Sequence, residues 1–267
     1  MKKLSLTARS LGPLPLDDCL SEVQALGFAG MDLGARPAHA FSREFATPAD
    51  RADWTRRIAD AGLEVSGMAV APPGPYPLRD ASTAEFATIL RFAADLGTRM
   101  LRLEAAIPPD SHDLAAVRGR HVGLAATCKA WARLAADEGV RLVWDYQARG
   151  QVPMGSGTVA TGDATSLALD VLAEVDEPNF GLVFRPDLAV EPAALGPFGV
   201  LDRLEGAVGA VMLTAPCPDL ADLLPALLRA DLPTAWWTLD LDPRPDAREA
   251  AAAWVGSLDA FLAQSDP

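Results

Sequence analysis

The chain repeats one pattern eight times: a short apolar run suited to a buried strand is followed by a longer segment with apolar residues at helical spacing. The predicted strands lie at residues 3–7, 29–33, 63–70, 99–105, 140–146, 180–184, 209–215 and 234–241. Strands that alternate with helices are typical of a parallel sheet covered by helices. Eight such units within 267 residues predict a closed (β/α)8 barrel that forms one domain over residues 1–267.

Residues that begin and end helices support the same division of the chain. Thr47 followed by Pro48 predicts a helix N-terminus, and Gly62 predicts where that helix ends. Ser82 and Glu85 form a capping-box pattern before the next helix. A doubly wound open sheet is the alternative fold, but it usually has fewer strands, and no GxGxxG motif follows the first strand here. The pattern therefore favours the barrel.

The composition argues against several classes of partner. The net charge is −13 and no cluster of Lys and Arg appears, which disfavours nucleic acid as a ligand. No apolar stretch approaches the roughly 18 residues of a transmembrane helix, and the start lacks the apolar region of a signal peptide. The three cysteines are far apart and have no metal-binding spacing. We therefore expect a cytoplasmic protein that binds neither nucleic acid nor a membrane.

In a barrel of this kind, the residues at the carboxyl ends of the strands face the functional site. These positions hold Asp32, Glu104, Asp145, Arg185, Met212 and Asp240, with Asp187 and Asp242 just beyond. Arg102 shares a face with Glu104, and burial in an ion pair is one interpretation of it. Gln147 follows the fifth strand, and one of Trp236 and Trp237 is expected to line the barrel. These side chains are candidates for contact with a ligand.

Six segments carry a resemblance to a known family. They are "LGFAGMDLG", "IADAGLEVSGM", "AADLGTRMLRL", "AADEGVRLVWDY", "EPNFGLVFRPDL" and "WWTLDLD". In this order they resemble successive blocks of the xylose isomerase-like sugar phosphate isomerase/epimerase family, over nearly the whole chain. The resemblance implies a TIM barrel that acts on a small sugar and holds one divalent metal ion. It also leaves a homo-oligomer open, because such proteins are often dimers or tetramers.

The resemblance implies four metal ligands: a glutamate on the fifth strand, an aspartate on the sixth, a histidine on the seventh and a glutamate on the eighth. This chain has Asp145, Arg185, Met212 and Asp240 at those positions, and Gln147 where relatives often carry histidine. A hard cation prefers oxygen or imidazole ligands, so neither a guanidinium nor a thioether fits. We therefore expect no metal cofactor, with Mn²⁺ or Mg²⁺ as the alternative if this interpretation is wrong.

Arg185 then raises its own hypothesis. We expect its guanidinium to take the place of the metal ion and to pair with Asp145, with Asp240 or with both. A structural counter-ion is favoured over an anion clamp. Whether Asp187 or Asp242 restores a metal site stays open.

Two functions are compatible with these residues. The first, implied by the resemblance, is a sugar or sugar phosphate isomerase or epimerase in which Asp145 and Asp240 transfer protons. Substrate contacts would come from Glu104, Arg185, Gln147 and Trp236. The alternative is a non-catalytic barrel that binds a small sugar, polyol or sugar acid, or a partner protein. The DNA-repair endonuclease branch of the superfamily is disfavoured, because it needs many His ligands and a basic face, whereas this chain has 3 His and a charge of −13.

Overall fold

The eight predicted strands are present, and they pair in chain order to close a parallel barrel. They are β1 (Lys3–Thr7), β2 (Gly30–Leu33), β3 (Glu64–Val70), β4 (Met100–Glu104), β5 (Arg141–Asp145), β6 (Phe180–Phe184), β7 (Val208–Leu213) and β8 (Trp236–Leu239). β1 closes the barrel by pairing with both β2 and β8. The predicted (β/α)8 barrel is thereby confirmed.

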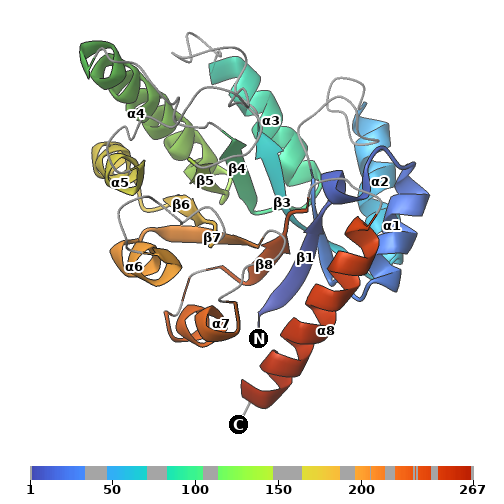
Figure 1. The fold of residues 1–267 in the computed structure, drawn as a ribbon. Coiled ribbons are helices and arrows are strands. Elements are labelled where there is room, and N and C mark those ends of the chain that lie inside the picture. The colour runs from blue at the N-terminus through green and yellow to red at the C-terminus, as the bar shows by residue number, and fades with distance from the viewer. Residues whose placement is uncertain are drawn as a thin grey trace.

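Helices surround the strands as an outer layer (Figure 1). They are the α-helices α1 (Leu16–Ala25), α2 (Pro48–Asp60), α3 (Thr83–Asp95), α4 (Leu114–Asp137), α5 (Ala164–Val175), α6 (Gly196–Arg203), α7 (Leu220–Arg229) and α8 (Ala247–Ser265). A short 3-10 helix, η1 (Ala8–Leu11), directly follows β1. The computed structural model describes residues 2–33, 47–70, 83–104, 114–146, 164–186, 196–204, 206–213, 220–230, 232, 234–241 and 246–265. None of the helices described there is both long and apolar enough to cross a membrane.

The start of α2 matches the sequence prediction. Thr47 caps the helix by accepting a hydrogen bond from the Asp50 backbone N–H at 3.2 Å. The Asp50 carboxylate in turn accepts one from the Thr47 backbone N–H at 2.8 Å, which completes a capping box. After the helix, Gly62 adopts φ 69°, in the left-handed region that glycine enters without a steric penalty, so the chain turns into β3.

The two faces of each strand pack differently. Side chains alternate along a strand, so every second residue points outward to the helices and the others point into the barrel. The outer core includes large, fully buried side chains such as Trp144 and Trp237. Inside the barrel, an apolar layer is formed by Met100, Val143, Val183, Ala210 and Met212. Most of this layer lies one step nearer the strand starts than the charged residues, and Met212 reaches the charged residues by contact with Arg185.

Close approach of strands within the barrel depends on glycine at the start of β2. A Cβ atom added to Gly30 would lie 2.7 Å from the Glu64 carbonyl oxygen and 2.8 Å from the Trp236 ring. Backbone atoms of a strand cannot move aside as a flexible side chain can. Gly30 is therefore required for the pairing of β2 with β3 in this register.

Candidate functional site

Arg185 directly follows β6, and its guanidinium bridges two carboxylates at the carboxyl ends of the strands. Its Nε donates to Asp145 Oδ1 and Oδ2 at 3.1 and 3.0 Å, and its Nη2 donates to Asp145 Oδ2 at 2.6 Å. Its Nη1 donates to Asp240 Oδ2 at 2.9 Å. All three residues are at most 2% exposed. The predicted pairing of the arginine is confirmed, and it involves both aspartates.

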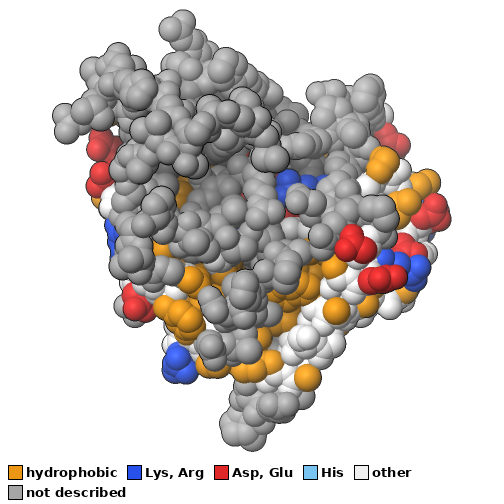
Figure 2. All heavy atoms as spheres, in the orientation of Figure 1, with side chains coloured by type: hydrophobic (Ala, Val, Ile, Leu, Met, Phe, Trp, Pro, Cys, Tyr) orange, Lys and Arg blue, Asp and Glu red, His pale blue; other side chains and the backbone are white. Residues whose placement is uncertain are grey.

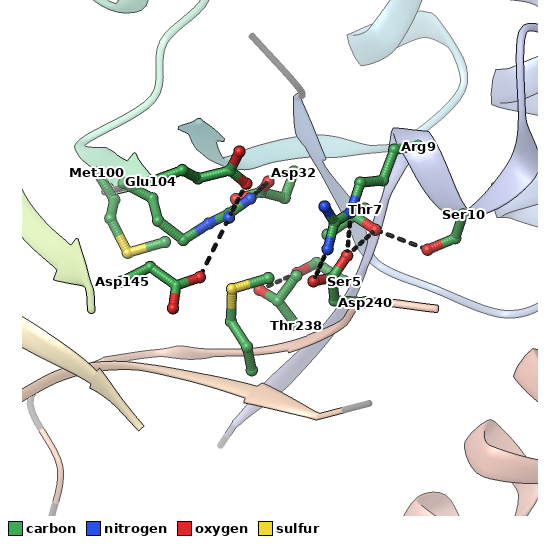
Figure 3. A network of polar contacts seen from close by, with 12 residues as sticks. Ser5, Thr7, Arg9, Ser10, Asp32, Met100, Glu104, Asp145, Thr238 and Asp240 are labelled. Atoms are coloured by element: carbon green, nitrogen blue, oxygen red, sulfur yellow. Dashed lines mark hydrogen bonds and ion pairs between the residues drawn. The ribbon is translucent and has the colours of Figure 1, made fainter. Parts of the chain in front are cut away.

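Asp240, which comes directly after β8, also receives hydrogen bonds from the end of β1. Thr7 Oγ1 donates to Asp240 Oδ1 at 3.0 Å, and Arg9 Nε donates to the same oxygen at 2.6 Å. Arg9 Nη2 pairs with the other oxygen. Figure 3 shows Thr7, Arg9 and Ser10 around Asp240. Burial alone would raise the pKa of Asp240, but the positive charges of Arg185 and Arg9 outweigh it and hold that pKa well below its usual range.

Arg102 on β4 forms a second buried group of ion pairs. Its Nη2 donates to Asp32 Oδ1 at 2.6 Å, and its Nη1 donates to Glu104 Oε1 at 2.5 Å. The same Nη1 lies 3.7 Å from Asp145 Oδ2, which links this group to Arg185. Burial raises the pKa of Asp32 despite the attraction of Arg102. The pKa of Glu104 is lowered, because attraction by Arg102 and Arg9 exceeds the effect of burial.

The two groups form one continuous network, because Arg185 pairs with both Asp145 and Asp240 and Arg102 lies 3.7 Å from Asp145. Figure 3 shows Asp32, Glu104 and Asp145 on one side of this network and Asp240 with Arg9 on the other. The network has three arginines against four carboxylates, so its formal charge is −1 when all are ionised. Only two members reach the surface appreciably: the side chain of Arg9 is 18% exposed and that of Glu104 is 12% exposed. Figure 2 shows Lys or Arg atoms with acidic atoms beside them at the surface, over the end of β1. Among the described residues of the network, Arg9 and Glu104 are therefore the ones that a ligand could reach from solvent.

The four positions at which the family resemblance predicts metal ligands surround a hydrogen-bond donor, the guanidinium of Arg185. Met212 on β7 contacts Arg185, whose Nη2 lies 3.4 Å from the Met212 sulfur. Within the described parts of the chain, no group of three or more His, Cys, Asp or Glu side chains is arranged to hold a metal ion. The space among these four positions contains the guanidinium.

Of the other predicted site residues, one joins the network, three lie outside the described residues and one lies elsewhere in the barrel. Glu104 joins the network, whereas Gln147, Asp187 and Asp242 lie outside the described residues. Trp236 is the first residue of β8, four positions before Asp240, so it lies about 13 Å nearer the strand starts. The structure therefore does not bring Trp236 to this end of the barrel.

Three residues of this site were missed from the sequence. Thr7, Arg9 and Ser10 belong to β1 and η1, and the hydroxyls of Thr7 and Ser10 lie 2.6 Å apart. The available signal was polar residues at the end of a predicted strand and directly after it, which are the positions that face the site in a barrel of this class.

Comparison with known proteins assigns the fold. A family model described as the xylose isomerase-like TIM barrel matches residues 20–187. The chain belongs to this family. No curated protein matches it in a sequence search.

Solved structures resemble this xylose isomerase-like barrel over its whole length. A probable 3-DHS dehydratase, AsbF, from Bacillus anthracis has a TM-score of 0.71 at 14% identity, covering 96% of this chain and 98% of its own. A sugar phosphate isomerase/epimerase from Parabacteroides distasonis has 0.70 at 14% identity, covering 95% of each chain. A family 2 AP endonuclease from Brucella melitensis has 0.69 at 16% identity, covering 96% of this chain and 99% of its own. At such identities the likeness establishes the fold alone.

Proposed function

We propose that this protein is a metal-independent member of its family that binds a small, neutral, hydroxyl-rich ligand of the carbohydrate type at the carboxyl ends of the strands. The observation that carries the proposal is the bridge from Arg185 to Asp145 and Asp240. A divalent ion in this family sits among carboxylates and supplies positive charge to them. Here a guanidinium supplies the charge instead.

The side chains present do not fit a divalent metal ion. A cation placed between Asp145 and Asp240 would meet the guanidinium that bonds to both of them. A metal ion and the Arg185 guanidinium would repel each other when both lie between the two aspartates, and burial leaves little water to screen their charges. The thioether of Met212 is a poor ligand for Mg²⁺ or Mn²⁺. No step of a reaction is therefore assigned to a metal ion.

The aspartates are also poorly suited to proton transfer. A general base works best when its pKa lies near the working pH, whereas the pKa of Asp240 is well below its usual range. Both oxygens of Asp145 accept hydrogen bonds from Arg185. The guanidinium also fills the space between the two carboxylates, where a reacting carbon would have to lie. These contacts support a structural role for the two aspartates.

The charge of the network favours a neutral ligand over an acidic one. Arg185 was a candidate to bind an acid, but its charge is shared by two aspartates and its side chain is 0% exposed. The groups nearest the surface, Arg9 and Glu104, offer one set of donors and one set of acceptors. Sugar hydroxyls donate and accept hydrogen bonds, so they match this pair better than a second carboxylate would.

Isomerase or epimerase activity is the second candidate. It is favoured by one observation: Asp145 and Asp240 stand at the ends of the fifth and eighth strands and approach the same guanidinium. Turnover would require a sugar to displace Arg185 from between them. An Asp145→Asn variant separates the candidates, since it should abolish isomerisation of a sugar followed by NMR.

Metal titration tests the first part of the proposal. Chelator-treated protein is titrated with Mn²⁺, Co²⁺ and Mg²⁺ by calorimetry, in parallel with Arg185→Asp and with Arg248→Asp as an exposed control on α8. The native protein and the control should show no stoichiometric binding. The Arg185→Asp variant should bind Mn²⁺, because three carboxylates then face the vacated space. Tight binding by the native protein would refute the proposal.

Ligand titration tests the second part. D-Xylose, D-fructose and D-glucitol serve as neutral probes and D-gluconate as the acidic one. Glu104→Gln should weaken binding of the neutral probes, whereas Glu174→Gln, an exposed change on α5, should not. Preferential binding of gluconate would contradict the argument from charge. A homo-oligomer, the absence of nucleic-acid binding and a cytoplasmic location stay predictions.

A further inference from the structure

A cavity of about 420 Å³ opens at the opposite mouth of the barrel, where the strands begin. Its lining includes Glu64, Met100, Arg141 and Trp236, which are the first residues of β3, β4, β5 and β8, and Gly209, the second residue of β7. Small-molecule sites typically have volumes of about 300–1,000 Å³, so this space holds more than a bare ion. The inner apolar layer separates it from the network around Arg185.

Arg141 is the residue of this cavity whose charged side chain lacks a partner among the described residues and could bind a ligand. It lies on the same strand face as Val143 and Asp145, so its side chain belongs to the interior of the barrel. Its Nε is buried and has no hydrogen-bond partner in the structure. Burial lowers the pKa of Arg141, and no carboxylate contributes to offset that effect. An arginine donor left in this state costs free energy unless another acceptor reaches it.

The neighbouring acids do not fill this role. Glu64 pairs with Lys3, whose Nζ lies 2.5 Å from Glu64 Oε1. Asp176 and Glu177 lie along a second cavity that also touches Arg141, and Glu177 bonds to Arg133 at 2.6 Å. Among the described residues, no carboxylate forms an ion pair with Arg141.

The charges at this mouth are mainly positive. The described lining of this cavity holds two arginines, Arg99 and Arg141, and one acid, Glu64, which Lys3 pairs with, whereas the whole chain has a net charge of −13. Arg99 donates to the Glu138 carbonyl at 3.2 Å and keeps its charge unpaired by any carboxylate in the described residues. A local excess of positive charge in an acidic protein attracts anions to that place.

Gly209 leaves space beside the Arg141 side chain because it has no Cβ atom. A Cβ atom at Gly209 would lie 3.3 Å from Arg141 Nε and 2.5 Å from Val143 Cγ1. Any larger residue would crowd the unpaired donor. The indole ring of Trp236 forms another part of the wall, with Lys3 Nζ 5.2 Å from the ring centroid.

We infer that this mouth is a second ligand site, which binds the oxyanion group of a small metabolite, a phosphate or a carboxylate, through Arg141. The terminal N–H groups of the guanidinium form a planar fork that matches two oxygens of such a group, whereas Nε is buried and is reached only if the side chain turns toward the cavity. The cavity beside it accommodates the rest of the molecule. This site does not depend on the ligand proposed for the other mouth.

Calorimetric titration with sodium phosphate and with sodium succinate, at constant ionic strength, tests the inference and tells the two oxyanions apart. Native protein should bind at least one of them saturably. Arg141→Gln should weaken that binding by about tenfold or more, as expected for loss of a charged hydrogen-bond donor. Arg248→Gln, which removes an exposed charge of the same kind on α8, should change the affinity by less than about twofold. Absence of binding of both probes, or equal affinity in native protein and Arg141→Gln, would overturn the inference.

A second measurement keeps the test valid if Arg141→Gln does not fold. In the native protein, the ¹⁵N–¹H signal of Arg141 Nε is assigned by its loss in Arg141→Lys. Addition of the bound probe should shift this signal, because the oxyanion binds the guanidinium to which Nε belongs. A signal that stays in place while the probe binds would show that the anion lies elsewhere and would refute the assignment of Arg141.

Discussion

Replacing Arg185 by methionine measures how strongly the folded state depends on the bridge between Asp145 and Asp240. Methionine keeps much of the length of the side chain but removes every donor. Both carboxylates are at most 2% exposed, so each would lose its contact with Arg185 without gaining water. Removing one partner from a buried ion pair typically costs about 3–5 kcal/mol. Asp240 keeps Arg9 and Thr7, so the loss falls mainly on Asp145.

The assay is urea unfolding followed by circular dichroism at pH 7, with the free energy of unfolding taken by linear extrapolation. We expect Arg185→Met to lower that free energy by about 3–5 kcal/mol. The matched control is Arg56→Met on α2, since Arg56 also pairs with two carboxylates, Asp53 and Asp60, but is 64% exposed. Exposed pairs contribute about 0–1 kcal/mol, so the control should hardly change.

The interpretation has a second check. If the loss comes from uncompensated charge, adding Asp145→Asn to Arg185→Met should restore part of the stability, because the neutral amide costs less to bury than a carboxylate. An Arg185→Met variant that is destabilised by less than about 1 kcal/mol, within the range of an exposed pair, would refute the reasoning that the bridge stabilises this end of the barrel.

Further predictions follow from single residues. Because the pKa of Asp240 is lowered on folding, its contribution to stability is complete above the unfolded pKa of about 4 and is lost as the pH falls through the folded value. In Asp240→Asn, the free energy of unfolding from urea titrations should therefore fall less steeply as the pH is lowered. Gly30→Ala should destabilise the protein by about 1–3 kcal/mol, since the added Cβ meets the Glu64 carbonyl oxygen at 2.7 Å. Gly256→Ala on α8, where nothing lies within 4 Å, should instead stabilise it by about 0.5–1 kcal/mol; thermal melts that rank these two variants the other way would contradict the packing argument. Thr47→Ala should cost about 1 kcal/mol through loss of the capping box, measured by the same melts.

The sequence predicted the barrel well because buried parallel strands have a strong local signature. Short apolar runs such as Phe180–Phe184 are separated by helices with apolar residues at regular spacing, and both are properties of neighbouring residues. The pairing of Arg185 could also be predicted, since the strand order brings its position close to the ends of β5 and β8.

Other parts of the site depend on contacts that local patterns do not encode. Arg9 reaches Asp240 across 231 positions of the chain, and only closure of β1 against β8 brings them together. For Trp236 and Trp237, alternation indicated that one of them lines the barrel but not how far along the strand it lies. The strand begins at Trp236, so this residue lies at the opposite mouth from the predicted substrate site.

The covalent attachment of the guanidinium gives the barrel a property that a metal-dependent relative would lack. A bound ion stabilises a fold by an amount that grows with its free concentration and disappears when a chelator removes it. The positive charge of Arg185 is present at full occupancy from the moment the chain folds, whatever metal ions surround it. Changes in the metal supply of the surroundings should therefore leave this end of the barrel intact.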